Sequence, residues 1–245
     1  MKSGGYRPSD LLRGADIPDG LLEALPKTDL HCHLDGSLRM NTFMELGPAA
    51  GLDMPEDPEE VRARYFPADR EAVQHEFLKH FDHTAAVLQD HENLSRVARE
   101  LAVDFADQGV WHLEVRFCPL MHVAGGMSPD EAVAAVKAGL DQAAAEREIS
   151  TGIVITGIRT IEPARSLELA ELAVDWKGRG VVAFDLAGAE QDNPAKNHLA
   201  AFYHVMNHNQ NSTIHAGEGF GPESIHQALH RCGANRIGHG TRLEE

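Results

Sequence analysis

The stretch Thr28-Asp-Leu-His-Cys-His-Leu-Asp-Gly-Ser37 decides how the rest of the chain is interpreted. His31 and His33 lie two residues apart in a short apolar run typical of a β-strand, where successive side chains point to opposite faces. Both imidazoles therefore share one face, at a spacing suited to a metal ion, and Cys32 points away from it. The alternative is one buried and one exposed histidine with no common ligand.

Two later segments favour the metal interpretation. The segments Ile214-His215-Ala-Gly-Glu218 and Ile237-Gly-His239-Gly240 each place a histidine at the end of another short apolar run. Three strand ends that all carry histidine are hard to explain by chance.

Composition and charge narrow the class of protein. The chain has 245 residues, of which 42% are hydrophobic and 24% charged, enough for one large domain. Its net charge of −16 repels polyanions, so neither nucleic acid nor an acidic membrane surface is expected as a partner. There is no apolar run of membrane-spanning length, and three cysteines without a CxxC pair favour a reducing cytoplasm. The sequence predicts no particular oligomeric state.

The first half of the chain is predicted to be mainly helical. Residues 1–27 form a lead-in, and the first strand spans 28–35. A helical insertion follows over 36–110, with helices at 40–46 and 71–89 and a third helix in which apolar residues recur at helical spacing. The proline-rich, acidic stretch 53–60 is predicted to be a loop. The recurring residues of the third helix are Leu94, Val97, Leu101 and Phe105.

The second half alternates strands and helices. Strands are predicted at 112–117, 151–158, 181–186, 212–216 and 236–239. A loop over 119–126 precedes Ser128-Pro129-Asp-Glu131, which predicts a helix with a capping box, and three further helices are predicted at 166–176, 194–206 and 222–232. Repeated strand and helix units of this kind build a parallel sheet with right-handed crossovers.

The positions of the polar residues favour a barrel over a doubly wound sheet. A doubly wound sheet typically carries a glycine-rich phosphate turn after its first strand, whereas Leu34-Asp-Gly-Ser37 has no such pattern. A (β/α)8 barrel places functional residues at the carboxyl ends of many strands. Here such residues end every predicted strand, and Arg116 and Arg159 among them are expected to be salt-bridge partners at the barrel mouth.

The number of strands falls short of a complete barrel. Six strands are predicted, and the sequence ends at Glu245, directly after the sixth. We therefore expect residues 28–245 to form about six of the eight βα units of a TIM-type barrel, as a truncated product or a fragment of a longer one.

The residues at the strand ends suggest a hydrolytic metal site. His31, His33 and His215 supply three imidazoles, and a catalytic zinc keeps a further position open for water. Glu218 follows His215 by three residues, where an acid suits proton transfer, and His239 is placed to orient or deprotonate the attacking water. The set describes metal-assisted attack of water on an sp² carbon.

Several segments together resemble the adenosine deaminase family of the amidohydrolase superfamily, in the family's order from residue 28 onward. The segments are Thr28–Ser37, Phe77-Leu-Lys-His-Phe-Asp82, Glu114-Val-Arg-Phe-Cys-Pro119, Asp185-Leu-Ala-Gly188, His215-Ala-Gly-Glu218 and Gly238-His-Gly240. The H-x-E and P-C-x-x-C signature of cytidine-type zinc deaminases is absent from the sequence.

The resemblance implies a role for each matching position. One zinc ion would be bound by His31, His33 and His215, and adenosine or 2′-deoxyadenosine would be converted to inosine and ammonia. Glu218 would protonate the purine ring and His239 would act on the attacking water. The remaining matches concern the nucleoside: Gly188 would meet the purine, His33 and Asp35 the ribose hydroxyl, and Phe77, Leu78 and Phe81 would form an apolar lid.

Alternatives remain open at this point. In the family the fourth metal ligand is an aspartate after the eighth strand, which would lie beyond Glu245, so one alternative is an inactive homologue that lacks this ligand. A second alternative is an enzyme that deaminates adenine or a modified purine. Asp35 would otherwise cap the helix that follows, Gly188 would supply only a turn, and Phe77, Leu78 and Phe81 would belong to the core. Hydrolases that bridge two metals with a modified lysine are disfavoured, because residues 181–188 contain no lysine.

Overall fold

A computed structural model describes residues 20–66 and 80–244, and six parallel strands form its central sheet. The strands are paired in the order in which they occur along the chain. They curve into a nearly closed barrel wall, so that the rings of His31 and His239, on the first and last strands, lie only 4.7 Å apart. The strands are β1 (Lys27–His33), β2 (Val110–Phe117), β3 (Ser150–Ile158), β4 (Val181–Ala187), β5 (Asn211–Ala216) and β6 (Arg236–His239).

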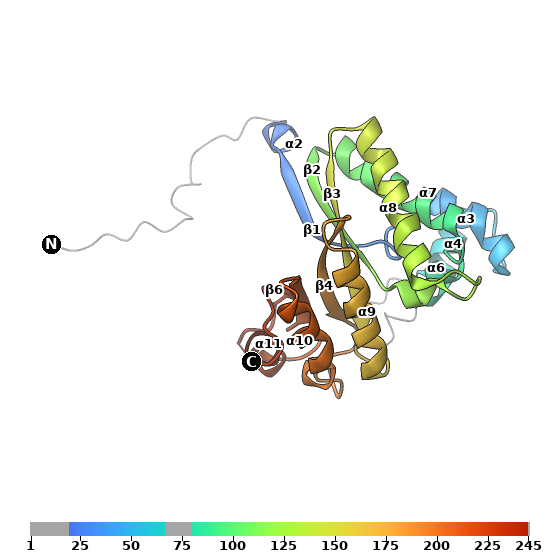
Figure 1. The fold of residues 1–245 in the computed structure, drawn as a ribbon. Coiled ribbons are helices and arrows are strands. Elements are labelled where there is room, and N and C mark those ends of the chain that lie inside the picture. The colour runs from blue at the N-terminus through green and yellow to red at the C-terminus, as the bar shows by residue number, and fades with distance from the viewer. Residues whose placement is uncertain (1–19, 67–79, 245) are drawn as a thin grey trace.

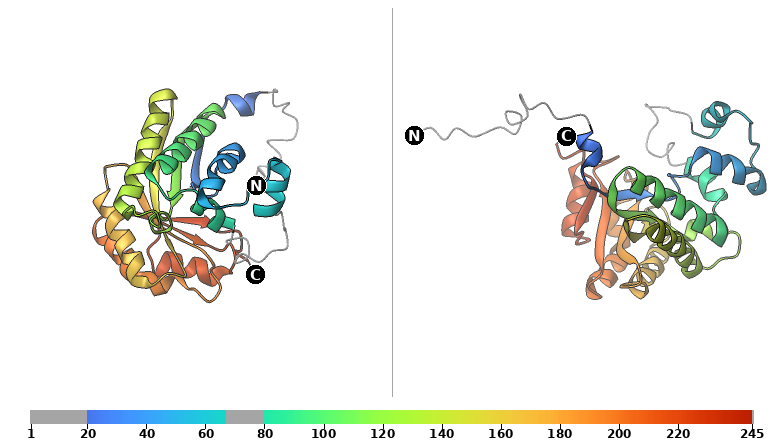
Figure 2. Two further views of the ribbon diagram at one scale, coloured as in Figure 1. Left: turned by 90° about the vertical axis from the view of Figure 1, so that its right-hand side faces the viewer. Right: turned by 90° about the horizontal axis from the view of Figure 1, so that it is seen from above.

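Helices connect the later strands and cover the outside of the wall (Figures 1 and 2). They are α8 (Pro129–Glu146), α9 (Pro163–Asp175), α10 (Leu199–Asn207) and α11 (Pro222–His230). The capping box at Ser128 is confirmed, with both reciprocal hydrogen bonds to Glu131. Because every crossover returns to the same end of the sheet, the carboxyl ends of the strands form one rim.

In its described part, the insertion between β1 and β2 contains helices and loops but no strand. It contains α3 (Met40–Leu46), the 3₁₀ helix η1 (Gly47–Ala50), α4 (Pro58–Tyr65), α6 (His80–Ala86) and α7 (His91–Asp107). A short helix α2 (Leu21–Ala24) precedes β1. The insertion helices gather with α8 on one side of the molecule (Figure 1). The helix predicted at 71–89 lies partly outside the described residues.

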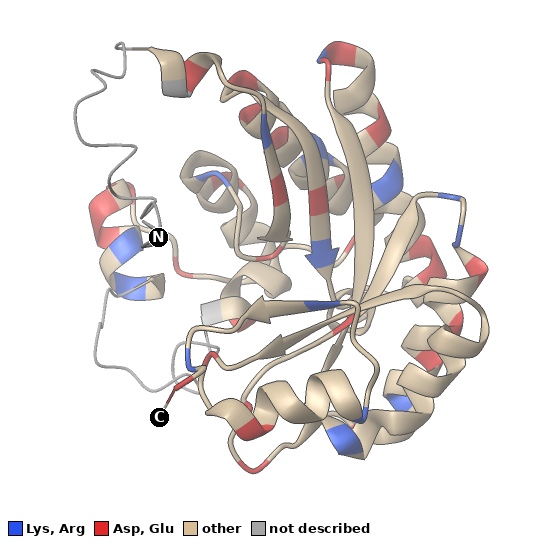
Figure 3. Cartoon of the chain, turned by 90° about the vertical axis from the view of Figure 1, so that its left-hand side faces the viewer, with Lys and Arg blue, Asp and Glu red and all other residues tan. Residues whose placement is uncertain are grey.

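The apolar face predicted for α7 is confirmed and packs against α8. Leu94, Val97 and Leu101 are buried, and Phe105 packs at the edge of the core. Burial of each such leucine or valine stabilises the fold by about 1.5–3 kcal/mol. Outside the core, the helices carry charged residues of both signs (Figure 3), and Arg99 of α7 pairs with Glu146 of α8 at 2.6 Å.

Three local predictions were wrong. The stretch 53–60 is not all loop, because α4 begins at Pro58, where the side chain of Asp57 accepts a hydrogen bond from the backbone of Glu59. The loop after β2 contains a 3₁₀ turn, η2 (Pro119–His122), and the helix predicted at 194–206 is divided into η3 (Ala195–His198) and α10. In the first two cases a proline that was taken as a loop signal starts a turn of helix.

The described residues contain no helix with both the length and the apolar character required to span a bilayer.

Candidate active site

Three imidazoles converge at the carboxyl rim of the sheet. The Nε2 atom of His215, on β5, lies 3.0 Å from Nε2 of His31 and 3.0 Å from Nε2 of His33, both on β1. One ligand atom from each ring lies within 4.8 Å of the others, and these three are the only such metal-type cluster among residues 20–66 and 80–244. The predicted alternation on β1 is confirmed, since Cys32 is buried and its thiol contacts the Ser37 hydroxyl.

A buried carboxylate fixes the orientation of one of these rings. Nδ1 of His215 donates to Oδ1 of Asp185 on β4, at 3.1 Å, which leaves the Nε2 lone pair facing the other histidines. Nη1 of Arg116 donates to the second oxygen of Asp185 at 3.0 Å. Burial opposes the charged form, but His215 and Arg116 outweigh burial and hold the pKa of Asp185 well below its usual range.

The donor set fits zinc. Burial, with the charges of neighbouring groups, lowers the pKa of His31 and of His33 to about 3, so both rings are neutral and offer lone pairs near pH 7. Two nitrogens that each lie 2.0–2.1 Å from one tetrahedral zinc are separated by roughly 3.3 Å. The observed separations of 3.0 Å are close to that value. Imidazole nitrogens held by a carboxylate partner are the ligands that zinc prefers.

A carboxylate and a fourth imidazole lie beside the three histidines. Nε2 of His239 lies 3.4 Å from Oε2 of Glu218, and the His239 ring lies 5.1 Å from the His215 ring. Burial lowers the pKa of His239, while the charge of Glu218 acts in the opposite direction. The backbone of His239 has φ +67°, a conformation uncommon for residues other than glycine and often found at functional sites.

Gly238 provides the space that His31 occupies. A Cβ atom at position 238 would lie 2.7 Å from Cε1 and 3.1 Å from Nδ1 of the His31 ring. Because Gly238 has no side chain, the imidazole of His31 on β1 can reach the place where the three histidine rings converge.

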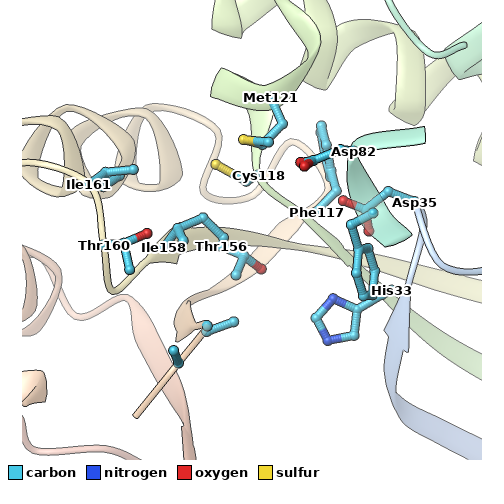
Figure 4. Close-up of a pocket in the computed structure, with 14 residues that line it drawn as sticks. His33, Asp35, Asp82, Phe117, Cys118, Met121, Thr156, Ile158, Thr160 and Ile161 are labelled. Carbon is cyan, nitrogen blue, oxygen red and sulfur yellow. The ribbon is translucent and has the colours of Figure 1, made fainter. Parts of the chain in front are cut away.

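A cavity of about 470 Å³ opens next to His33 (Figure 4). This is within the usual range for small-molecule sites. Its wall is mainly apolar, with two acids, Asp35 and Asp82, and no lysine or arginine among its described lining residues. The other lining residues are His33, Phe81, Phe117, Cys118, Met121, Thr156, Ile158, Thr160, Ile161, Ala187, Gly188 and Ala189.

Asp35 faces this cavity and does not cap a helix. It is 8% exposed, and its Oδ1 atom has no hydrogen-bond partner among the described residues. Burial raises its pKa to about 6. The residue at the N-terminal cap of α3 is Arg39, so the capping alternative for Asp35 is wrong. Phe81 and Gly188 line the same cavity, and Gly188 has φ +99°, whereas the predicted lid residues Phe77 and Leu78 lie outside the described residues.

Two buried residues at the rim have roles that the sequence analysis did not assign. Asp185 was expected among the polar residues at the strand ends and in a family segment, without a role of its own, and Glu190 was not noted. A charged residue within the apolar run 181–187 was a signal for Asp185, but Glu190 stands in a polar stretch that resembles surface loop. The expected pairing of Arg116 is confirmed. That of Arg159 is wrong, because Arg159 donates to the backbone oxygens of Asn193 and His215.

Comparison with known proteins gives consistent matches. The adenosine deaminase family matches residues 26–245. An adenosine deaminase of Mycobacterium avium is 44% identical over 225 residues, which cover 89% of this chain and 61% of the relative. One from Mycolicibacterium gilvum is also 44% identical, with 62% of its length covered. The chain thus spans about three fifths of the length of these relatives.

Solved structures agree on the fold. An amidohydrolase from Burkhoderia ambifaria with bound zinc has a TM-score of 0.83 at 25% identity, over 94% of this chain and 63% of that one. An adenine deaminase from Arthrobacter aurescens has a TM-score of 0.79 at 25% identity, over 89% and 66%. The Arabidopsis N6-mAMP deaminase has a TM-score of 0.79 at 29% identity, over 91% and 68%.

The parallel wall, the converging histidines at its rim and the match over residues 26–245 lead to one conclusion: this chain belongs to the adenosine deaminase family.

Proposed function

We propose that this chain carries the site for zinc-dependent hydrolytic deamination of adenosine and 2′-deoxyadenosine to inosine and ammonia. The observation that carries the proposal is the convergence of His31, His33 and His215 beside the pair formed by Glu218 and His239. One of these residues, His33, lines a cavity of about 470 Å³, which supports a small-molecule substrate.

In this proposal His31, His33 and His215 hold one zinc ion, with Asp185 fixing the tautomer of His215. When bound, zinc supplies Lewis-acid chemistry that makes water nucleophilic near neutral pH. His239 orients the water that adds to C6 of the purine and accepts a proton from it. The relative from Burkhoderia ambifaria with bound zinc supports the choice of metal.

Glu218 acts on the other reactant. Its carboxyl delivers a proton to the ring nitrogen next to C6, which makes that carbon more electrophilic. His239 then returns the proton it took from water to the amino group, which leaves as ammonia, and the proton of the new C6 hydroxyl returns to Glu218. Such proton transfer contributes about 10²–10⁴-fold to a rate. The backbone of Gly188 meets the purine, while His33 and Asp35 contact the ribose hydroxyls. Phe81 covers the nucleoside, and the same role is proposed for Phe77 and Leu78.

The charge of the cavity favours a nucleoside over a nucleotide. Relatives from Arabidopsis were solved with the nucleotides IMP and GMP. Here the described lining residues include Asp35 and Asp82 but no lysine or arginine. A 5′-phosphate would be repelled by these carboxylates, whereas an uncharged 5′-hydroxyl would not.

The test measures turnover by the 245-residue chain loaded with zinc. Adenosine, 2′-deoxyadenosine, adenine and AMP are compared at equal concentration by the ultraviolet change that accompanies deamination. We expect turnover of the two nucleosides and at least tenfold less of AMP. Turnover of adenine or AMP alone would exclude the nucleoside assignment. A folded, zinc-loaded chain without turnover of any of the four compounds would show that this chain is a homologue that binds metal but does not catalyse deamination.

A pair of variants assigns the activity to this site. Glu218→Gln removes the carboxyl and is expected to lower kcat by about 10²–10⁴-fold without loss of zinc. Glu223→Gln, an exposed acid in the first turn of α11, is the matched control and should keep the activity of the parent chain.

A further inference from the structure

One buried carboxylate collects three consecutive backbone amides. Glu190 lies three residues after the end of β4 and is 3% exposed. Its Oε2 atom accepts from the backbone nitrogen of Gly217 at 3.0 Å, and its Oε1 atom accepts from those of Glu218 and Gly219 at 2.7 and 3.0 Å. Hydrogen bonds to a charged acceptor are about twice as strong as those between neutral groups. The loop that carries Glu218 is thus fixed on its N–H side.

The same loop is fixed on its carbonyl side by the segment after β6. The carbonyl oxygen of Gly217 accepts from the backbone nitrogens of Thr241 and Arg242 at 3.0 and 3.1 Å, and from the Thr241 hydroxyl at 2.9 Å. The carbonyl oxygen of Glu218 accepts from Nε of Arg242 at 2.9 Å. Donors and acceptors on both sides of Glu218 are therefore held by different parts of the chain.

The metal ligand at the start of this loop has separate anchors. The ring of His215 is held by Asp185, and its carbonyl oxygen accepts from Nη2 of Arg159 at 2.8 Å. Neither hydrogen bond is made by Glu190, although the charge of Glu190 acts on Arg159 and opposes the effect of burial on its pKa. Loss of the Glu190 carboxylate would therefore release the residues after His215 and leave the three histidines in place.

We infer that Glu190 is a positioning residue whose carboxylate sets the place of the Glu218 side chain relative to His239 and the cavity. Glu190 binds backbone nitrogens of the loop that carries Glu218, so it acts through the placement of Glu218. Only a carboxylate serves all three amides: glutamine offers one oxygen, and its NH₂ group would face a backbone N–H. The catalytic part of this inference rests on the proposed function.

The first test measures the loop and does not depend on activity. Backbone amide exchange at residues 217–219 is compared between the zinc-loaded parent chain and Glu190→Gln. We expect exchange at these amides to become about 10- to 100-fold faster, with zinc content unchanged. The control is Glu100→Gln, another buried carboxylate, which bonds Thr42 and Arg96 on the insertion helices. Unchanged exchange at 217–219 in Glu190→Gln would overturn the inference.

The second test asks whether Glu190 acts through Glu218. We expect Glu190→Gln to lower kcat by about 10- to 100-fold with little change in KM, and to add nothing further in a Glu218→Gln background. A purely structural role would give additive losses, or a loss of kcat in Glu100→Gln as well, and either result would overturn the inference. If the parent chain lacks activity, the proposed function fails, and the exchange measurement still decides the role of Glu190.

A variant on the carbonyl side of the loop keeps the inference testable if Glu190→Gln does not fold. Thr241→Val removes the hydroxyl bond to Gly217 from an exposed position. It is expected to speed exchange at 217–219 in the same sense as Glu190→Gln, by a smaller factor. Exchange unchanged in this variant and in Glu190→Gln would show that the loop is held by other contacts.

Discussion

Substitution of Gly238 by alanine tests the metal site through a single added methyl group. The new Cβ would lie 2.7 Å from Cε1 of His31. This is roughly 0.8 Å short of the closest ordinary carbon–carbon contact of about 3.5 Å. Gly238 does not have a positive φ, so alanine adds no backbone strain and the imidazole must move. Ligand distances in metal sites are conserved to about 0.2 Å, so a shift of this size removes or distorts one of three ligands.

We expect Gly238→Ala to weaken zinc binding by about a hundredfold, at the upper end of the effects of mispositioned ligands. The loss of folding stability from overpacking should be only about 1–3 kcal/mol. Competition with a chelator of known affinity measures the first quantity, and urea denaturation of the metal-free chain measures the second. The control is Gly157→Ala on β3, whose added methyl would lie 3.3 Å or more from its neighbours, and its three nearest atoms belong to Ser166, Phe184 and Leu186 and to none of His31, His33 or His215. A folded Gly238→Ala protein with the zinc affinity of the parent would refute the assignment of His31 as a ligand.

Three further predictions concern buried polar groups. His122 is fully buried and its pKa is lowered by burial to about 4. Because the unfolded chain binds this proton near pH 6.5, His122 contributes stability above that pH and loses it as the pH falls towards 4, by about 3 kcal/mol. Denaturation at pH 7 and pH 4.5 should show a smaller difference in the free energy of unfolding between the two pH values for His122→Asn than for the parent chain. An equal difference in the two proteins would contradict this prediction. Asp185→Asn leaves Arg116 buried without its counter-charge. We therefore expect the free energy of unfolding, measured by denaturation, to fall by about 3–5 kcal/mol and zinc binding to weaken by about 10- to 100-fold. A stable variant with normal zinc affinity would be inconsistent with the pairing of Asp185 with Arg116 and His215. Burial raises the pKa of Cys118 to about 12, so mass spectrometry should find no alkylation of this thiol in the native chain at pH 8 within the time that labels the unfolded chain completely.

Much of the fold could be predicted because its signals are local. The six strands lie within two residues of the predicted ranges, since each is a short apolar run bounded by turn residues. Period-two alternation was enough to place His31 and His33 on one face. The helix at 58–65 was missed because proline and acidic residues were taken as loop signals, although Asp57-Pro58 also fits the start of a helix.

The parts that were missed depend on contacts between distant segments. Glu190 is buried because three amides lie 27 to 29 residues further along the chain, and no local pattern reveals them. Arg159 was expected to find a carboxylate, but the rim of the barrel presents it with two backbone oxygens. Such partners are set by tertiary packing, which sequence periodicity does not encode.

The spacing of the histidines along the chain also bears on the order of folding. His31 and His215 are 184 residues apart and meet only when β1 and β5 stand in the same wall. Contacts between such distant residues form late, because a long loop must close before they are gained. During synthesis the first pair of imidazoles leaves the ribosome long before its partner. Uptake of zinc by the nascent chain would therefore report the moment at which β1 and β5 take their places in the same wall.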